Sequence, residues 1–201
     1  MEAKKIIITG SATRIGAAIA KSLAGHDTQL TLHYNKSSKE VKKLKIELEN
    51  LGSKIFLVKA DLTKIAQTKK IIPQSYKMMQ GIDCLINNAS IFENDDLSNF
   101  NEKSFNKHVL VNLYAPAILT QDLKRYLKSQ KGNIINIIDQ RIFKLTPFFF
   151  SYTLSKTGLQ TLTKTSAMKL APNIRVNGVA PGPTIKNKRQ SDKHFRKQWK
   201  S

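Results

Sequence analysis

The sequence of 201 residues contains one cysteine, Cys84, so an internal disulfide is excluded. It has no apolar run close to the roughly 20 residues that a membrane-spanning helix needs. Its first ten residues, MEAKKIIITG, hold too few apolar side chains for a secretory signal. These absences argue against secreted, disulfide-bonded and membrane-spanning proteins. We expect a cytoplasmic protein in which Cys84 lies in a buried strand.

Acidic residues are also scarce, since 14 Asp and Glu stand against 34 Lys and Arg, giving a net charge of +20. Such an excess suits a polyanionic partner. However, only six of the basic residues are Arg, the Lys residues are scattered along the whole chain, and no nucleic-acid-binding module is visible. A general compositional bias explains this pattern better. We therefore expect a small-molecule substrate, and neither nucleic acid nor a metal ion as a partner.

Short apolar runs alternate with stretches of helical spacing along the chain. The expected strands are residues 5–9, 28–34, 54–59, 82–88, 133–138 and 174–179, and the expected helices are residues 15–25, 38–51, 63–80, 101–130 and 152–171. Pro73 predicts a kink or break in the third helix. Continuous apolar strands are typical of a parallel sheet buried on both faces. The sequence thus predicts an α/β domain with a doubly wound parallel sheet (Rossmann fold), and right-handed crossovers favour about six strands in the order 3-2-1-4-5-6.

The stretch TGSATRIG, residues 9–16, joins the first expected strand to the first helix. Gly10 would allow a tight turn and Gly16 would allow close packing of the helix on the sheet. Backbone N–H groups at the helix start would then face a pyrophosphate. A plain turn without a ligand explains the glycine pattern almost as well. Arg14 is unusual in such a turn because it adds a long cationic side chain.

The end of the second strand, HYNKSS, lacks the carboxylate that usually binds the ribose of NAD. Asn35, Lys36 and Ser37 instead offer donors and a positive charge, which suit the 2′-phosphate of NADP(H). Lys36 alone is explained more simply as a solvated loop residue, but Arg14 and Lys36 together favour NADP(H). Asp61 follows the third strand, where it would accept from the adenine amino group or cap the next helix.

Tyr152 and Lys156 lie four residues apart in YTLSK, on one face of a helix. A neighbouring ammonium favours the phenolate, so the pair predicts a lowered tyrosine pKa and a proton donor usable near neutral pH. Asp139 ends the fifth strand, ahead of Tyr152. A Tyr-x-x-x-Lys pair arises often by chance, but here it follows the NNAS stretch at residues 87–90 and a helix that contains Asn112. The small residues of NNAS end the fourth strand and would let the backbone approach a ligand closely.

Together these motifs resemble the short-chain dehydrogenase/reductase family over essentially the full length, ending with IRVNGVAPGP at residues 174–183. The resemblance implies that Tyr152 is the acid, that Lys156 holds the ribose and tunes Tyr152, and that Asn112 anchors a water relay. The residues that it places against NADP(H) are Gly10, Arg14, Ile15, Gly16, Asn35, Lys36, Ser37, Asp61, Leu62, Asn88, Ala89, Ser90, Lys156, Pro181 and Gly182.

Two departures from the common family pattern, Arg14 for Gly and Asp139 for Ser, resemble the pteridine reductase branch. In that branch a Phe after NNAS, matched by Phe92, sandwiches the pterin ring with the nicotinamide. The Asp supports the Tyr in protonating a ring nitrogen while NADPH delivers hydride to the adjacent carbon. Phe92 is explained about as well as a loop residue tucked into the core. The catalytic set is then Asn112, Asp139, Tyr152 and Lys156.

The resemblance implies an NADPH-dependent reductase of a pteridine-like or carbonyl substrate. A 3-oxoacyl thioester or ketone reductase of the same family is the alternative, as is an inactive remnant that at most binds nucleotide. The family continues past the PG motif with a covering region, a further helix and a seventh strand. We expect a reductase domain over residues 1–184, a basic tail over residues 185–201 that starts the covering region, and C-terminal truncation. The seventh strand and helix also help to form the homotetramer that the family implies.

Overall fold

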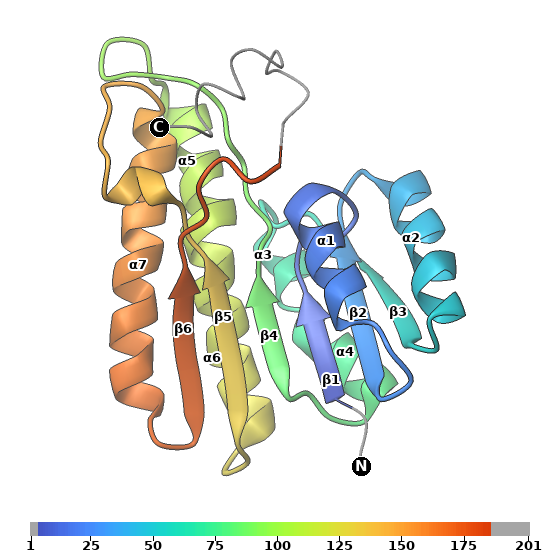
Figure 1. Ribbon diagram of the computed structural model, residues 1–201. Coiled ribbons are helices and arrows are strands. Elements are labelled where there is room, and N and C mark those ends of the chain that lie inside the picture. Colours follow the sequence, from blue (N-terminus) through green and yellow to red (C-terminus); the bar gives the residue numbers. More distant parts are fainter. Residues whose placement is uncertain (1–3, 186–201) are drawn as a thin grey trace.

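The computed structural model describes residues 4–185 and contains a six-stranded sheet in which every pair of neighbouring strands is parallel (Figure 1). The strands are β1 Lys4–Ile8, β2 Thr28–Tyr34, β3 Lys54–Lys59, β4 Cys84–Asn87, β5 Gly132–Ile137 and β6 Ile174–Val179. Their order is β3-β2-β1-β4-β5-β6. The predicted strands and their order are confirmed, with strand ends shifted by no more than two residues.

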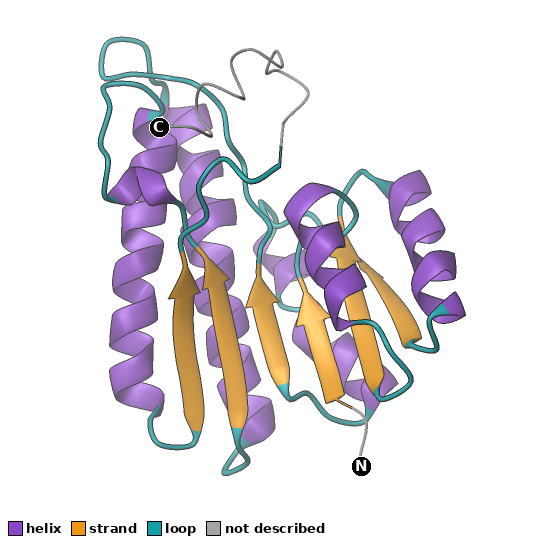
Figure 2. Ribbon diagram, viewed as in Figure 1, coloured by secondary structure: helices purple, strands orange, loops and turns teal. Residues whose placement is uncertain are grey.

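Helices lie on both faces of this sheet (Figure 2). They are α1 Arg14–Leu23, α2 Ser38–Asn50, α3 Ile65–Thr68, α4 Ile71–Met79, α5 Glu102–Val109, α6 Ala115–Leu127 and α7 Phe150–Leu170, with a π-helical segment η1 Leu110–Tyr114 and a 3-10 turn η2 Gln140–Ile142. One apolar core lies under α1 and α2, and a second lies under α4 and α6. The fold is therefore the doubly wound arrangement.

Strand β1 shows why the sequence pattern is continuous rather than alternating. Ile6 and Ile8 belong to the core under α1 and α2, whereas Ile7 belongs to the core under α4 and α6. All three side chains are at most 5% exposed. Each contributes about 1.5–3 kcal/mol by leaving water. A strand buried on both faces needs apolar residues at successive positions, and this need produces the run KIII.

Two predicted helices differ from the structure in their interior. The third helix does break, but it breaks at residues 69–70, ahead of Pro73, which is the third residue of α4. A proline is tolerated there because the first N–H groups of a helix have no partner within the helix. The helix expected over residues 101–130 is divided into α5, the π-helical η1 and α6. The widened turn has no signal in the residue spacing.

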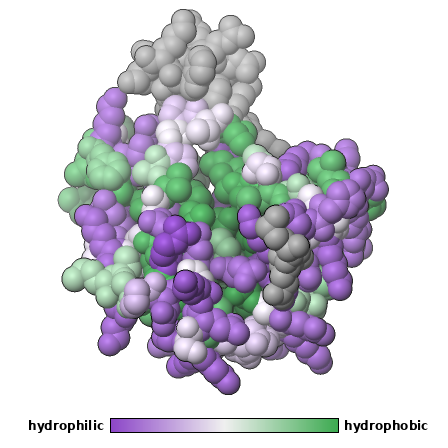
Figure 3. All heavy atoms as spheres, turned by 60° about the horizontal axis from the view of Figure 1, so that its bottom comes forward, coloured by the Kyte–Doolittle hydropathy of each residue, from purple (hydrophilic) through white to green (hydrophobic). Residues whose placement is uncertain are grey.

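The outer surface adds two facts. Hydrophilic residues cover much of the face in Figure 3, with apolar residues showing between them. No helix within residues 4–185 is long and apolar enough to cross a bilayer.

Cys84 begins β4 and is partly buried, and burial, aided by the nearby Asp83, raises the pKa of its thiol to about 12.

Strand β6 is an edge of the sheet as described, and the described part of the chain continues past it to Ile185. The predicted tail, residues 185–201, lies outside the described residues except for Ile185, so the domain boundary stays a prediction. The loops that follow the strands gather at the upper side of the sheet in Figure 1. In open α/β sheets this carboxyl edge is where ligands bind.

Candidate active site

A cleft of about 1510 Å³ lies at the carboxyl ends of the strands. All of the predicted site residues line this cleft except Ser37 and Asn112. Ser37 occupies the residue before α2, and Asn112 is fully buried behind the wall, in η1. Within residues 4–185 no three His, Cys, Asp or Glu side chains gather in a way that would hold a metal ion. The chain folds so that residues from all six strand ends meet in one space.

The turn after β1 and the first turn of α1 have no room for side chains at Gly10 and Gly16. Gly10 has φ +61°, and a Cβ there would lie 2.8 Å from Ala89 Cα. A Cβ at Gly16 would overlap the carbonyl oxygen of Gly10 and lie 2.6 Å from Asn88 Nδ2. Asn88 braces the same turn by donating to the carbonyls of Thr9 and Gly10 at 2.9 and 3.0 Å. Such a cradle of backbone at a helix start fits a pyrophosphate.

Arg14 begins α1 with φ +51°, a left-handed conformation that is rare for a residue with a Cβ. Its Nη2 donates to the carbonyl oxygen of Ile185 at 3.0 Å. The side chain thus reaches across the cleft to the segment after β6. Asn35 and Lys36 line the same cleft. The structure adds this contact to the predicted role of Arg14 as a phosphate clamp.

Asp61, directly after β3, accepts from both the backbone N–H and the hydroxyl of Thr63, at 2.9 and 2.8 Å. Burial opposes ionisation of this carboxyl, but the Thr63 hydrogen bonds and the nearby cations Lys64 and Lys36 hold its pKa below the usual range. Asp61 therefore shapes its own loop and also lines the cleft. Its carboxylate stays ionised and able to accept a further hydrogen bond.

The hydroxyl of Tyr152 donates to Asp139 Oδ2 at 2.6 Å, and Asp139 Oδ1 accepts the backbone N–H of Arg141 at 2.9 Å. Tyr152 is 4% exposed. Burial and the Asp139 carboxylate raise the pKa of Tyr152 well above its usual range, while Arg141 and Ser90 oppose this shift. The predicted lowering of the tyrosine pKa is therefore wrong, because burial and a neighbouring acid outweigh the nearby cation.

Lys156 lies one turn further along α7 and is 2% exposed. Its Nζ donates to the carbonyl oxygen of Ile137 at 2.7 Å and lies 5.8 Å from the centroid of the Tyr152 ring. Burial lowers the pKa of Lys156 to about 8, although Asp139 opposes the shift. The ammonium is thus held by the end of β5 and is poised to change its charge in the range where enzymes work.

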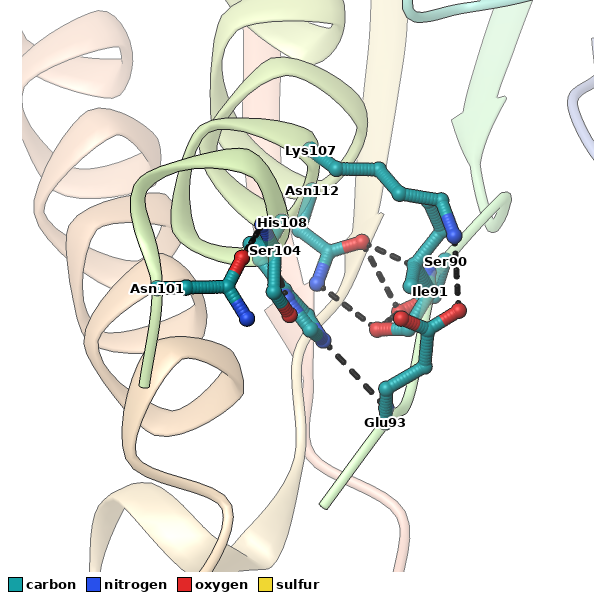
Figure 4. A network of polar contacts seen from close by, with 8 residues as sticks. All are labelled: Ser90, Ile91, Glu93, Asn101, Ser104, Lys107, His108 and Asn112. Atoms are coloured by element: carbon teal, nitrogen blue, oxygen red, sulfur yellow. Dashed lines mark hydrogen bonds and ion pairs between the residues drawn. The ribbon is translucent and has the colours of Figure 1, made fainter. Parts of the chain in front are cut away.

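Asn112 uses its whole amide inside the protein, and Figure 4 shows its contacts with Ser90 and Ile91. Its Oδ1 accepts from the Ile91 N–H at 2.8 Å and from the Ser90 hydroxyl at 3.2 Å. Its Nδ2 donates to the Ile91 carbonyl and to Ser155 Oγ, each at 3.0 Å. The side chain joins the loop after β4 to α7. The predicted water relay therefore has no free group on this amide.

Phe92 lines the cleft and belongs to a cluster of aromatic rings with Phe149 and Tyr152. The sequence did not reveal this cluster. It stacks on Phe149, with ring centroids 4.3 Å apart and an interplanar angle of 2°, and it meets the Tyr152 ring edge-on at 4.7 Å. The guanidinium of Arg141 lies 4.4 Å from the Phe149 centroid and 5.6 Å from that of Phe92. The run FFF at residues 148–150, just before Tyr152, was the available signal for this cluster.

Asp95 is a further residue that sequence reasoning missed. It is 5% exposed and accepts from the backbone N–H of Ser151 at 3.1 Å, and also from the Ser151 hydroxyl. Its carbonyl oxygen accepts from the Phe150 N–H at 3.2 Å. Since Ser151 directly precedes Tyr152, Asp95 fixes the start of α7 and so the position of the phenol.

Comparisons with known proteins bear on the family and the fold. The family model described as short chain dehydrogenase matches residues 4–196. An uncharacterized oxidoreductase of Methylorubrum extorquens is 29% identical over 92% of this chain and 75% of its own. Dehydrogenase/reductase SDR family member 4 of Homo sapiens is 30% identical over 89% of this chain, which spans 65% of that relative.

Solved structures are more similar still. FolM Alternative dihydrofolate reductase 1 from Brucella suis, in complex with NADP, is 39% identical with a TM-score of 0.92, over 97% of this chain and 78% of its own. The protein of the same name from Brucella canis, also complexed with NADP, is 40% identical with a TM-score of 0.91, over 96% and 77%. The fold, the site geometry and the family match lead to one conclusion: the chain belongs to the short-chain dehydrogenase family.

Proposed function

We propose that the protein is an NADPH-dependent reductase of a flat, pteridine-like heterocycle, with Tyr152 as the proton donor. The observation that carries this proposal is the 2.6 Å hydrogen bond from Tyr152 to Asp139 beside the ring of Phe92. A carboxylate next to the phenol suits proton delivery to a ring nitrogen, and an aromatic face suits a planar ring. The similar proteins from Brucella are called dihydrofolate reductases and were solved with NADP. Their name supports the proposed substrate class, and the bound NADP supports the proposed cofactor.

The residues present fit NADP(H). The glycine cradle at Gly10 and Gly16 would take the pyrophosphate, and Lys36 and Asn35 would take the 2′-phosphate. When bound, the cofactor supplies the hydride. Tyr152 supplies the proton, so that a C=N bond of the substrate gains hydrogen at both carbon and nitrogen. Asp139 accepts a hydrogen bond from the Tyr152 hydroxyl and so fixes the position of the phenol. After the transfer, a proton taken up from water by Asp139 would return to the phenolate.

The test is a titration of the full chain with NADPH and NADH, followed by assays with dihydrobiopterin, dihydrofolate and an acetoacetyl thioester. We expect NADPH to bind more tightly than NADH and only the pteridines to be reduced. Turnover of the thioester alone would identify a ketone or 3-oxoacyl reductase of the same family. A folded chain that binds neither cofactor would contradict the whole proposal.

A further inference from the structure

Two buried histidines each contact one loop of the cleft, and His33 also lines the cleft. His33, near the end of β2, is 2% exposed, and its Nδ1 accepts the backbone N–H of Gly10 at 3.1 Å. Because Nδ1 accepts, the ring proton must be on Nε2, which contacts the Ala60 carbonyl oxygen at 3.1 Å. The backbone carbonyl of His33 also accepts from the Ser11 N–H at 3.0 Å. The His33 ring thus connects the turn after β1 to the residue that follows β3.

His108, in α5, has the same arrangement with the opposite tautomer. It is fully buried, and its Nε2 accepts the backbone N–H of Glu93 at 3.2 Å. Its Nδ1 therefore carries the proton and donates to the Ser104 carbonyl oxygen at 2.9 Å. The imidazole also lies edge-on to the Tyr152 ring, with centroids 6.4 Å apart. His108 ties the loop after β4 to α5.

The loop that His108 holds is the one that carries Phe92. Asn112, one turn further along, binds both the N–H and the carbonyl oxygen of Ile91 at 2.8 and 3.0 Å. The backbone of Phe92 is therefore held on both sides, through Ile91 by Asn112 and through Glu93 by His108 (Figure 4). The Lys107–Glu93 ion pair, 2.7 Å long, adds a side-chain contact to the same loop.

Neither imidazole has a nitrogen left for a ligand, since both nitrogens of each ring contact the backbone. What each ring accepts is an N–H from a loop, not from a helix or a strand. Only the neutral form can accept this hydrogen bond. Burial, opposed by the Ala60 contact, lowers the pKa of His33 to about 4, so its ring is neutral at physiological pH.

We propose that His33 and His108 are positioning residues, of which His33 fixes the phosphate turn for the cofactor and His108 fixes the Phe92 loop for the planar substrate. The assignment of ligands to the two loops rests on the proposed function. The bracing of the loops does not, because it follows from the hydrogen bonds alone. A general structural role would weaken cofactor binding and substrate binding together, whereas each of these two roles affects one of them.

The experiment uses two pairs of variants of the full chain. His33→Leu removes the acceptor for Gly10, and His33→Asn restores an oxygen near the position of Nδ1. His108→Leu removes the acceptor for Glu93, and His108→Gln restores an oxygen near the position of Nε2. NADPH binding is followed by cofactor fluorescence. Dihydrofolate binding to the NADP⁺-saturated protein is followed by calorimetry.

We expect His33→Leu to weaken NADPH binding ~10-fold and dihydrofolate binding less than ~2-fold, since a lost buried hydrogen bond is worth about one factor of ten or more. His108→Leu should do the reverse. His33→Asn and His108→Gln should recover most of the loss. Lys107→Ala, which removes the half-exposed ion pair with the Glu93 side chain, should weaken dihydrofolate binding less than His108→Leu does.

Amide hydrogen exchange gives a readout that needs no ligand. The Gly10 amide should exchange faster only in His33→Leu, and the Glu93 amide only in His108→Leu. Equal loss of both ligands in both Leu variants, or unchanged protection of these amides, would overturn the proposal. If the wild type binds no NADPH, the proposed function fails, and the exchange rates alone decide whether the two histidines hold their loops.

Discussion

The two halves of the cleft are built from different parts of the polypeptide. In the half after β1, β2 and β3, which we assign to the cofactor, backbone makes the shape, since Gly10 and Gly16 leave no room for a Cβ. In the half after β4, β5 and the start of α7, which we assign to the substrate and call the substrate half, side chains supply the chemical groups. Asp139, Tyr152 and Lys156 are held by hydrogen bonds of 2.6–2.7 Å. Substitutions of the two glycines should therefore act by steric overlap, and substitutions in the substrate half by charge and protons.

The halves also differ in what they cost the fold. A tight backbone turn costs the folded state little free energy once it has formed. A buried amine such as Lys156 does cost free energy, because burial disfavours its charged form. Its pKa is lowered to about 8 by burial. Such shifts gather at sites where chemistry takes precedence over stability. The substrate half is therefore where loss of function and gain of stability should coincide.

The largest effect is expected from Tyr152→Phe, which removes only the hydroxyl that donates to Asp139. Turnover should fall ~10³-fold, within the usual range for loss of a general acid, about 4 kcal/mol. The affinity for NADPH should change less than ~2-fold because the cofactor half is untouched. Steady-state kinetics with dihydrofolate and a fluorescence titration with NADPH check the two parts. A variant as active as the wild type would show that another group donates the proton.

Gly16→Ala should have the largest effect in the cofactor half. The added Cβ would overlap the Gly10 carbonyl oxygen and lie 2.8 Å from Ser11 Cα, and both are backbone atoms that cannot swing aside. We expect the free energy of unfolding to fall by about 3 kcal/mol and NADPH binding to weaken. Urea unfolding and NADPH titration measure these changes.

Gly25→Ala is the matched control for Gly16→Ala. A Cβ at Gly25 would meet only Asp27 Oδ1, at 3.5 Å, an ordinary contact. Its stability should stay within about 0.5 kcal/mol of the wild type. Equal losses in the two variants would mean that the turn after β1 is not the tightly packed element that the structure shows.

The fold could be predicted from the sequence because its signals are local. An apolar run such as KIII requires a strand buried on both faces, and right-handed crossovers then order the strands. Helix interiors were harder, because Pro73 is accepted inside the first turn of α4 and η1 widens without any signal in the spacing. Those details depend on tertiary packing.

The site divides in the same way. The glycine turn and the Tyr152–Lys156 pair are local patterns, and the sequence placed both at the cleft. Asp95 and Ser151 are 56 residues apart, and the Phe149 stack on Phe92 depends on the paths of two loops. No spacing rule links such residues. The sign of the Tyr152 pKa shift was missed for the same reason, because burial was not known.

Lys156→Met tests the cost of the buried amine. Below pH 8 the wild-type lysine is protonated in both the folded and the unfolded state. Between pH 8 and 10.5 the unfolded state binds more protons, so the wild type gains stability as the pH rises. From pH 7 to 9.5 the gain relative to the variant should be about 2 kcal/mol, at 1.36 kcal/mol per pH unit above pH 8.

Urea unfolding of wild type and Lys156→Met at both pH values measures this difference, and the variant cancels contributions from other titrating groups. Turnover should fall in the variant at either pH, though less than in Tyr152→Phe. A stability difference that does not change with pH would show that burial does not disfavour the lysine charge in the folded protein.

The smallest effect is expected at Arg14, which belongs to the cofactor half but acts through a side chain. Arg14→Gly removes a left-handed residue with a Cβ, at φ +51°, so the unfolding free energy should rise by about 1 kcal/mol. NADPH binding should nevertheless weaken ~10-fold, and more than NADH binding, if the guanidinium reaches the 2′-phosphate. Urea unfolding and paired titrations with NADPH and NADH measure both changes.

Lys36→Met is the comparison that decides between two roles for Arg14. Lys36 lines the cofactor half after β2, so its loss should weaken NADPH binding and leave NADH binding nearly unchanged. If Arg14→Gly shows the same selectivity, Arg14 is a phosphate clamp. If it weakens NADPH and NADH equally, its hydrogen bond to the Ile185 carbonyl is the important contact. Arg14 would then close the segment after β6 over whichever cofactor is bound, and the choice of NADPH would rest with the end of β2 alone.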